Sequence, residues 1–342
     1  MTFLLDDEQR EFGRTLDRML GAADSAGAVR AWAADDTAPG RKIWQRLTDM
    51  GLFALAVPEE HGGMGFRPVE LCIAFVELGR HAVPGPVVET VATAALLRRL
   101  GDPVLCARWL PGIAAEGLIV SYADTAYGPY ALDAATADAT FAADGDQLLR
   151  TTGGGPVQPS IDPARRLARP AADGETVASG PAVLAAAAYA GDVAALLTAA
   201  QTLGVGRRLL ADTVTYVQRR RQFGVAIGTF QAVKHRLADA LLALEFAQPL
   251  VFAAAVAMAG QGDERGGPGA ASEVAARRDA AAAKVAAGEA AYGAARAALQ
   301  LHGAIGYTEE LDLSLWIRKA RALRSAWGTP SQCRARVLSG TA

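Results

Sequence analysis

Cysteine is scarce in this sequence of 342 residues, with three positions that lie far apart at Cys72, Cys106 and Cys333. No two of them have the short spacing of zinc ligands, and three scattered cysteines do not form a disulfide framework. We therefore expect small buried hydrophobic side chains in a reducing cytoplasm, and we predict no metal site.

An excess of charge of one sign is also lacking. The 34 basic and 36 acidic residues give a net charge of −2, and no basic stripe stands out, which argues against a nucleic-acid partner. The first residues, MTFLLDDEQREF, become acidic without the basic and apolar regions of a signal peptide. Apolar runs such as 182–190 are short and alanine-rich, so we expect no membrane span.

What the sequence does contain is a large hydrophobic fraction, 51%, with long stretches dominated by alanine, the best intrinsic helix former. In the first third, the spacing of apolar residues predicts helices at 6–20, 70–79 and 88–100. Asp6 is the expected cap of the first helix, and Gly101 is expected to end the third.

The character changes between 118 and 181. Residues 118–122 read as a short apolar strand, and 151–159 contain three glycines and two prolines, which interrupt any long element. Short strands separated by turns fit this segment best. It is small for a domain that folds alone.

Helical patterns return after residue 181. We expect one helix up to a break at 219–228, and a second from its cap Thr229 to about Ala259. Beyond a glycine-rich linker, two more helices are predicted. The remaining segments are the linker 260–269, a helix over 272–301 that ends at Gly303, and a last helix over 311–326 that Gly328 and Pro330 stop.

Three segments, in this order, resemble one known family, the acyl-CoA dehydrogenases. The segments are VPEEHGGMG at 57–65 with ELGR at 77–80, RRQFG at 220–224 with IGTFQAVKH at 227–235, and QLHGAIGYT at 300–308 with Glu310. Together they cover nearly the whole chain. The resemblance implies a mainly α fold with a small β domain: an N-terminal helical domain at 1–117, a shortened middle β domain at 118–181 and a C-terminal four-helix bundle at 182–342.

The resemblance also implies FAD as the cofactor, an acyl-CoA thioester as the substrate, and assembly into homo- or hetero-oligomers. Arg220 would reach the pyrophosphate of a flavin whose ring lies in the neighbouring subunit, a role that suits guanidinium geometry. The other implied cofactor contacts are Gln222, Phe223, Gln231, Gln300, Gly303 and Ala304. A solvated basic turn and an ordinary helix end are the structural alternatives for the arginines and for Gly303.

The catalytic base of the family is missing from its two usual positions. One position directly precedes a Gly-Thr pair, here 328–329, and holds Trp327; the other matches Ala194. Neither side chain can accept a proton. The remaining candidates are Asp192, which points about 200° away from Ala194 on a helix, and Glu310, which is structural in relatives.

Three functions therefore stay open. The first is a subunit of an FAD-dependent acyl-CoA dehydrogenase that lacks the base and pairs with a second such subunit. The second is a self-sufficient homo-oligomeric dehydrogenase with a non-standard base. The third is a structural or binding protein that has kept the fold and lost redox chemistry.

Overall fold

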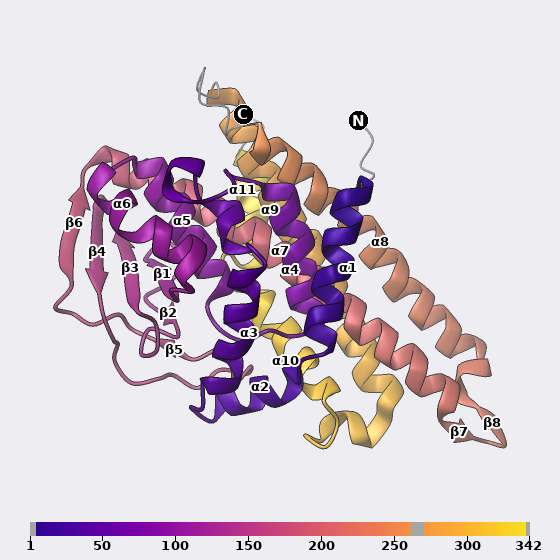
Figure 1. The fold of residues 1–342 in the computed structure, drawn as a ribbon. Coiled ribbons are helices and arrows are strands. Elements are labelled where there is room, and N and C mark those ends of the chain that lie inside the picture. The colour runs from indigo at the N-terminus through magenta and orange to yellow at the C-terminus, as the bar shows by residue number, and fades with distance from the viewer. Residues whose placement is uncertain (1–4, 261–269, 340–342) are drawn as a thin grey trace.

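The computed structural model describes residues 5–260 and 270–339, and its elements form a helical part, a small sheet and a second helical part (Figure 1). The first part also contains two 3-10 turns and a π turn. Its elements are α1 (Asp7–Gly21), α2 (Ser25–Ala33), α3 (Ala38–Asp49), η1 (Phe53–Ala56), η2 (Glu59–His61), α4 (Pro68–Arg80), α5 (Val87–Leu100), α6 (Pro103–Pro111) and η3 (Gly112–Glu116).

The predicted helices of this part are confirmed as α1, α4 and α5. Asp6 caps α1 as expected: its carboxylate accepts from the Gln9 amide at 2.8 Å, and the Gln9 side chain accepts from the Asp6 amide at 3.2 Å. These reciprocal bonds form a capping box. Gly101 ends α5 with a φ of 69°, a left-handed conformation that glycine adopts without strain.

The sheet lies at one side of the molecule, where β1 packs against α5 (Figure 1). Its strands, in the order in which they pair, are β1 (Val120–Asp124), β3 (Ala139–Asp144), β4 (Gln147–Thr151) and β6 (Glu175–Ser179). The β1–β3 pair is parallel and the other two are antiparallel. A separate antiparallel pair joins β2 (Ala131–Leu132) to β5 (Leu167–Ala168). The short strands predicted for this segment are confirmed.

The second helical part is a bundle built around one long helix. Its elements are α7 (Pro181–Arg219), β7 (Arg221–Gln222), β8 (Val225–Ala226), η4 (Ile227–Thr229), α8 (Gln231–Ala259), α9 (Ala270–His302), η5 (Gly303–Tyr307), α10 (Leu313–Leu323) and α11 (Pro330–Ser339). The central helix, α7, packs against α4, α5, α8, α9 and α10. It therefore joins the bundle to the first helical part.

Two glycines bring α4 and α7 into backbone contact. A Cβ atom on Gly79 would lie 1.9 Å from the Gln201 carbonyl oxygen, and one on Gly204 would lie 1.8 Å from that of Val76. Both distances are far below van der Waals contact. The crossing of these two helices therefore requires glycine at both positions.

Two predictions for the bundle are wrong. Thr229 does not cap α8, because its hydroxyl donates to the Ala226 carbonyl at 2.7 Å and the helix begins at Gln231. Pro330 was expected only to stop the last helix, but that helix, α10, already ends at Leu323. Pro330 is instead the first residue of a further helix, α11, where proline is tolerated because the first helical amide needs no acceptor. The predicted linker 260–269 lies outside the described residues except for Gly260.

Among the described residues, two helices are long and apolar enough to cross a membrane, by length and composition only. The apolar window of α7 is 78% buried within the fold, as expected of a core helix, whereas that of α8 is 39% buried. We expected apolar runs too short to span a membrane, and this expectation is wrong for the lengths of α7 and α8. The burial of α7 assigns it to the core, and α8 leaves an apolar face uncovered.

Candidate functional site

A short hairpin follows α7 and carries the first of the predicted cofactor residues. Arg221 and Gln222 pair with Val225 and Ala226, and the turn between them holds Phe223 and Gly224 at φ values of 52° and 80°. Two consecutive positive φ angles are typical of a tight hairpin turn. Because Phe223 has a side chain, its left-handed conformation is strained, and it is also 90% exposed.

The other predicted cofactor residues lie at the same end of the bundle. The Tyr216 ring of α7 stacks on His302 of α9 with 4.1 Å between centroids, and the Tyr216 hydroxyl donates to the His302 carbonyl. Arg236 of α8 donates to the Gln300 side chain. The structure thus gathers the ends of three helices and, with them, all seven predicted residues: Arg220, Gln222, Phe223, Gln231, Gln300, Gly303 and Ala304.

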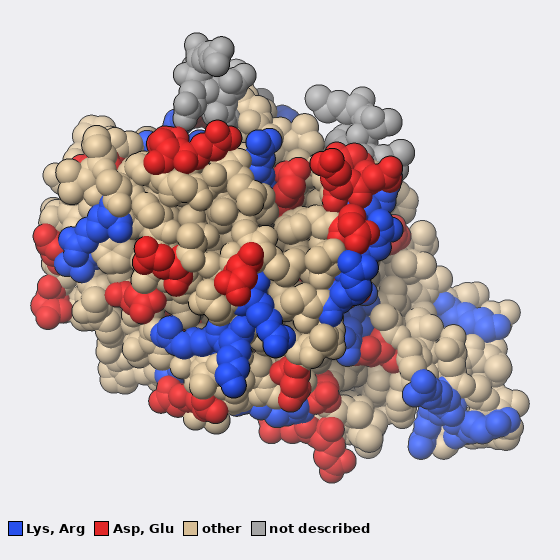
Figure 2. All heavy atoms as spheres, viewed as in Figure 1, with Lys and Arg blue, Asp and Glu red and all other residues tan. Residues whose placement is uncertain are grey.

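Basic side chains are exposed at this end, which we call the motif arm and define as residues 219–231 and 300–304. Figure 2 shows them over the β7–β8 end of the molecule. Arg219, Arg220 and Arg221 are exposed, and none forms an ion pair within the described residues. Gly303, at φ 65°, leaves its surroundings open, since a Cβ there would touch nothing within 4 Å.

These features fit the diphosphate and adenosine of FAD. Unpaired guanidinium groups bind phosphate oxygens, and the exposed amides of Gln222 and Gln231 supply further hydrogen-bond donors. Figure 1 shows the motif arm at the opposite end of the molecule from the sheet. None of the arm's residues lines the cavity that α5, β1 and the α10–α11 connection enclose beside the sheet.

That cavity has a volume of about 420 Å³ and is bounded by α5, the end of β1, the 160–167 loop and the α10–α11 connection. Trp327 forms part of its wall. Its indole stacks on Tyr122, with ring centroids 5.4 Å apart and planes 5° apart, and meets Tyr127 edge-on at 5.2 Å. Its φ of 53° is strained for a bulky residue. We call this space the Trp327 pocket.

Glu89 of α5 lies in the same pocket and was not predicted from the sequence. It is 3% exposed, and its Oε1 atom accepts from the Trp327 indole Nε1 at 3.0 Å. Burial raises the pKa of this carboxyl, although Arg165 and the Trp327 hydrogen bond act in the opposite direction. The available signal was a lone glutamate in the stretch VVETVATAALL, which has no other charged residue.

The two base candidates named from the sequence lie elsewhere. Asp192 is 8% exposed and pairs with Arg277 Nε at 2.9 Å. Burial raises the pKa of its carboxyl, while Arg277 acts against that shift. It lines a second cavity of about 510 Å³, which shares Tyr127 with the Trp327 pocket, and it does not line the Trp327 pocket itself. Glu310 is exposed between η5 and α10, and Ala194 is fully buried in α7.

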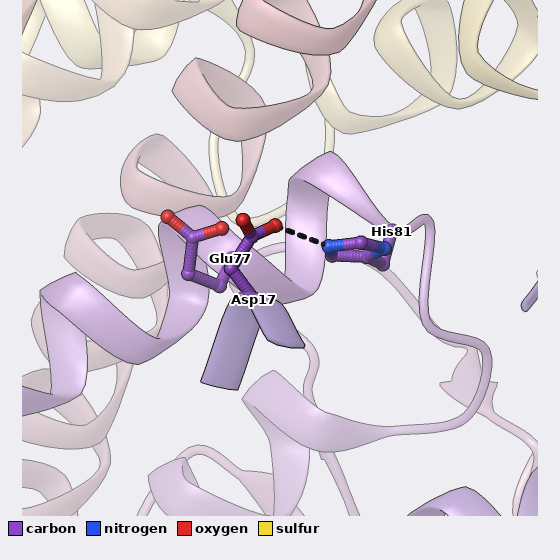
Figure 3. A group of neighbouring side chains, drawn as sticks. All are labelled: Asp17, Glu77 and His81. Carbon is purple, nitrogen blue, oxygen red and sulfur yellow. Dashed lines mark hydrogen bonds and ion pairs between the residues drawn. The ribbon is translucent and has the colours of Figure 1, made fainter. Parts of the chain in front are cut away.

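One group of potential metal ligands joins α1 to α4 (Figure 3). Asp17, Glu77 and His81 each offer a ligand atom within 4.8 Å of the others, and His81 Nε2 lies 2.8 Å from Asp17 Oδ1. Burial raises the pKa of Glu77 and lowers that of His81, and arginines surround both groups. Nearby guanidinium charge opposes a bound cation, so we interpret this group as a polar link between helices.

Comparison with known proteins identifies the same family that the three sequence motifs resemble. Residues 6–117 match the acyl-CoA dehydrogenase N-terminal domain, and residues 184–338 match the acyl-CoA dehydrogenase C-terminal domain. The chain is 32% identical over 338 residues to acyl-CoA dehydrogenase IpdE2 of Mycobacterium tuberculosis, covering 97% of each protein.

Solved structures share the fold. The ChsE4–ChsE5 complex from Mycobacterium tuberculosis contains a chain that aligns with a TM-score of 0.82 at 23% identity, covering 100% of this chain and 99% of that one. Butyryl-CoA dehydrogenase from Megasphaera elsdenii aligns with a TM-score of 0.79 at 20% identity, covering 100% of both chains.

Proposed function

The chain belongs to the acyl-CoA dehydrogenase family, and from this membership we propose that it is one subunit of an FAD-dependent acyl-CoA dehydrogenase. The proposed reaction oxidises the α–β bond of an acyl-CoA thioester. A partner subunit of the same fold supplies the catalytic base, and this chain supplies part of the flavin site.

The proposed reaction needs a carboxylate that removes the proton on the α carbon, within hydrogen-bond reach of it. When bound, FAD supplies the two-electron acceptor for the hydride that leaves the β carbon. The single observation that carries the proposal is Trp327, which stands where the family resemblance expects the base. Its indole nitrogen is already a donor to Glu89 and has no lone pair that could accept a proton.

The motif arm supports a role at the site of another chain. Arg220 is exposed, forms no ion pair within the described residues and does not line the Trp327 pocket. The β7–β8 hairpin that follows it lies at the opposite end of the molecule from the sheet (Figure 1). In the proposed assembly it binds the flavin diphosphate, and Gln300 and Gly303 pack on the adenosine half. Such a cross-subunit arrangement makes each cofactor site dependent on two chains.

The uncovered face of α8 supports an oligomer. Leu241, Leu242, Phe246 and Leu250 are exposed there, next to a groove of about 700 Å³ between α8 and α9. Contiguous exposed apolar surface of this kind marks association sites. One structural neighbour comes from a complex of two different chains, ChsE4 and ChsE5, and this likeness favours a hetero-oligomer. We also propose a cytoplasmic location, because all three cysteines are free and buried.

Purification of the chain with and without a second acyl-CoA dehydrogenase subunit tests the proposal. We expect flavin retention and flavin reduction by acyl-CoA only when the two chains are co-expressed. A chain that is yellow and reducible by itself would instead support the self-sufficient enzyme, and Asp192→Asn would then test that base. Absence of flavin from both preparations would support the redox-inactive alternative.

The Arg220→Ala variant of the co-expressed assembly isolates the role of the motif arm. We expect flavin occupancy to fall about tenfold or more, because a charge-assisted contact to the diphosphate is lost. Arg46→Ala is the matched control, since Arg46 is an exposed arginine on α3 and outside the arm. Unchanged flavin content in the Arg220 variant would refute the cross-subunit flavin site.

A further inference from the structure

Lys284 of α9 is a buried cation without an acidic partner. It is 2% exposed, and it forms no ion pair with any residue that the structure describes. Its Nζ atom donates instead to two backbone carbonyls, at 2.8 Å to the oxygen of Leu323 and at 3.2 Å to that of Arg324. A charge is costly to remove from water unless hydrogen bonds compensate, so these two bonds hold the ammonium group in place.

The two carbonyls lie at the end of α10. The last carbonyls of a helix lack an amide partner within it, and they carry the negative end of the helix dipole, so a lysine is a suitable donor there. Burial lowers the pKa of Lys284 to about 8; Cys333 opposes this shift, while Arg165 and Arg324 add to it. The amine is therefore still charged at neutral pH.

Glu289, further along α9, holds the same region through a second set of contacts. Its Oε1 atom accepts from Arg324 at 2.9 Å and from Arg334 at 3.3 Å. Arg324 directly follows α10, and Arg334 belongs to α11. Lys284 and Glu289 therefore contact the chain on both sides of the connection between these helices. We call these two residues the α9 clamp.

The connection that the clamp holds has a strained backbone. Trp327 has a φ of 53° and Gly328 has a φ of 117°. A bulky side chain disfavours the left-handed region, and such strain persists only where the surrounding structure imposes it. In this conformation the indole stacks on Tyr122 and donates to Glu89. Relaxation of the backbone at Trp327 would turn the indole away from both.

We propose that the α9 clamp positions Trp327: Lys284 and Glu289 fix the two ends of the connection, and the strained backbone between them directs the indole to Glu89. Both are positioning residues, because they act through the connection and belong to a helix of which no described residue lines the Trp327 pocket. This inference goes beyond the proposed function, since it concerns how the chain holds one of its own side chains and requires neither flavin nor a partner.

The indole N–H resonances of the ¹⁵N-labelled full chain report on Trp327 directly. The chain has five tryptophans, and Trp327→Phe identifies this resonance by its loss. Lys284→Met keeps an unbranched side chain of similar length and removes the charge. We expect it to shift the Trp327 resonance towards that of a free indole and to leave the tryptophans outside α10 in place. Leu47→Ala, a fully buried position on α3, is the control for general destabilisation and should leave Trp327 unchanged.

Thiol labelling gives an independent readout at Cys333. This residue is fully buried on α11, and a Cβ on Gly328 would lie 2.7 Å from its Sγ atom, so the thiol lies against the connection. Cys72, fully buried on α4, is the internal reference. Relative to Cys72, maleimide labelling of Cys333 should become about tenfold faster in Lys284→Met, because local opening exposes the thiol. Glu289→Ala should raise it about threefold, since its ion pairs are partly exposed.

Two results would overturn the proposal: an unchanged Trp327 resonance in the folded Lys284→Met protein, or an equal shift in Leu47→Ala. If Lys284→Met does not fold, the Glu289→Ala variant decides, and a Cys333 labelling rate equal to that of the wild type counts against the clamp. Flavin content of the co-expressed assembly is a separate readout, so failure here leaves the proposed function standing.

Discussion

The indole Nε1 of Trp327 donates to Glu89 Oε1 at 3.0 Å and joins two residues that are 238 positions apart in the chain. Both side chains are buried. This bond ties α5 of the first helical part to the segment between α10 and α11, across the end of β1. It also occupies the indole that stands in the expected position of the family's base.

Removing either partner of this hydrogen bond should destabilise the fold, and the effects of the two substitutions should not be additive. Trp327→Phe keeps a ring against Tyr122 but leaves the Glu89 oxygen without its donor, and Glu89→Leu leaves the indole N–H without its acceptor. Each variant should lose about 1–3 kcal/mol of unfolding free energy, and the double variant should lose less than the sum. Urea unfolding followed by circular dichroism measures all three. Strictly additive losses would mean that the hydrogen bond is energetically unimportant.

Asp133 should make stability depend on pH. It is 1% exposed and accepts from the Trp32 indole at 2.9 Å, and burial raises its pKa from 3.8 to about 7. Because the folded state then holds the proton more tightly than the unfolded chain, this group lowers the free energy of unfolding as pH rises from 3.8 to about 7 and adds no further slope above.

The Asp133→Asn variant tests this sign. It keeps an oxygen acceptor for Trp32 but cannot ionise, so its stability relative to the wild type should increase between pH 4 and pH 7, the window set by the shift of Asp133. Chemical unfolding at several pH values gives the difference. A difference that stays constant across this window would contradict the raised pKa.

The α4–α7 crossing should not tolerate a side chain. Gly204→Ala places a Cβ 1.8 Å from the Val76 carbonyl oxygen, so the helices must separate, at a loss of about 1–3 kcal/mol or more of unfolding free energy. Gly293→Ala on α9 is the matched control, because nothing lies within 4 Å of its Cβ. That variant should gain about 0.5–1 kcal/mol from better helix propensity. Thermal unfolding that ranks them in the reverse order would refute the close contact.

The exposed face of α8 should mediate assembly. Phe246→Asp places a charge where an apolar side chain is 75% exposed, so we expect the oligomer to dissociate about tenfold or more readily. Val104→Asp on α6 is the control, since Val104 is also 75% exposed but belongs to another part of the surface. Mass photometry over a dilution series compares the two variants. Equal behaviour would remove α8 from the interface.

Local sequence determined much of the helical framework. Asp6 predicts the start of α1 because its cap contacts lie within three residues, and Gly101 predicts the end of α5 because left-handed backbone favours glycine. The order of three short motifs was enough to indicate the family, which the domain matches confirm. The sequence predicted the wrong roles for Thr229 and Pro330. Threonine can cap a helix or bond within a turn, and proline can follow a helix or begin one, so the residue type alone does not distinguish these roles.

Only the tertiary structure decided what surrounds the pocket. The sequence places Trp327 before a Gly-Thr pair, but nothing local indicates that Glu89 meets it or that Arg277 pairs with Asp192. Helix caps depend on neighbours within one turn, whereas the burial and pKa of a carboxyl depend on residues brought together by packing. The sequence by itself determined most of the helical elements and the family, and it placed Trp327 where the family resemblance expects the base. Packing determined which acid stands beside Trp327 and which residues reach outward.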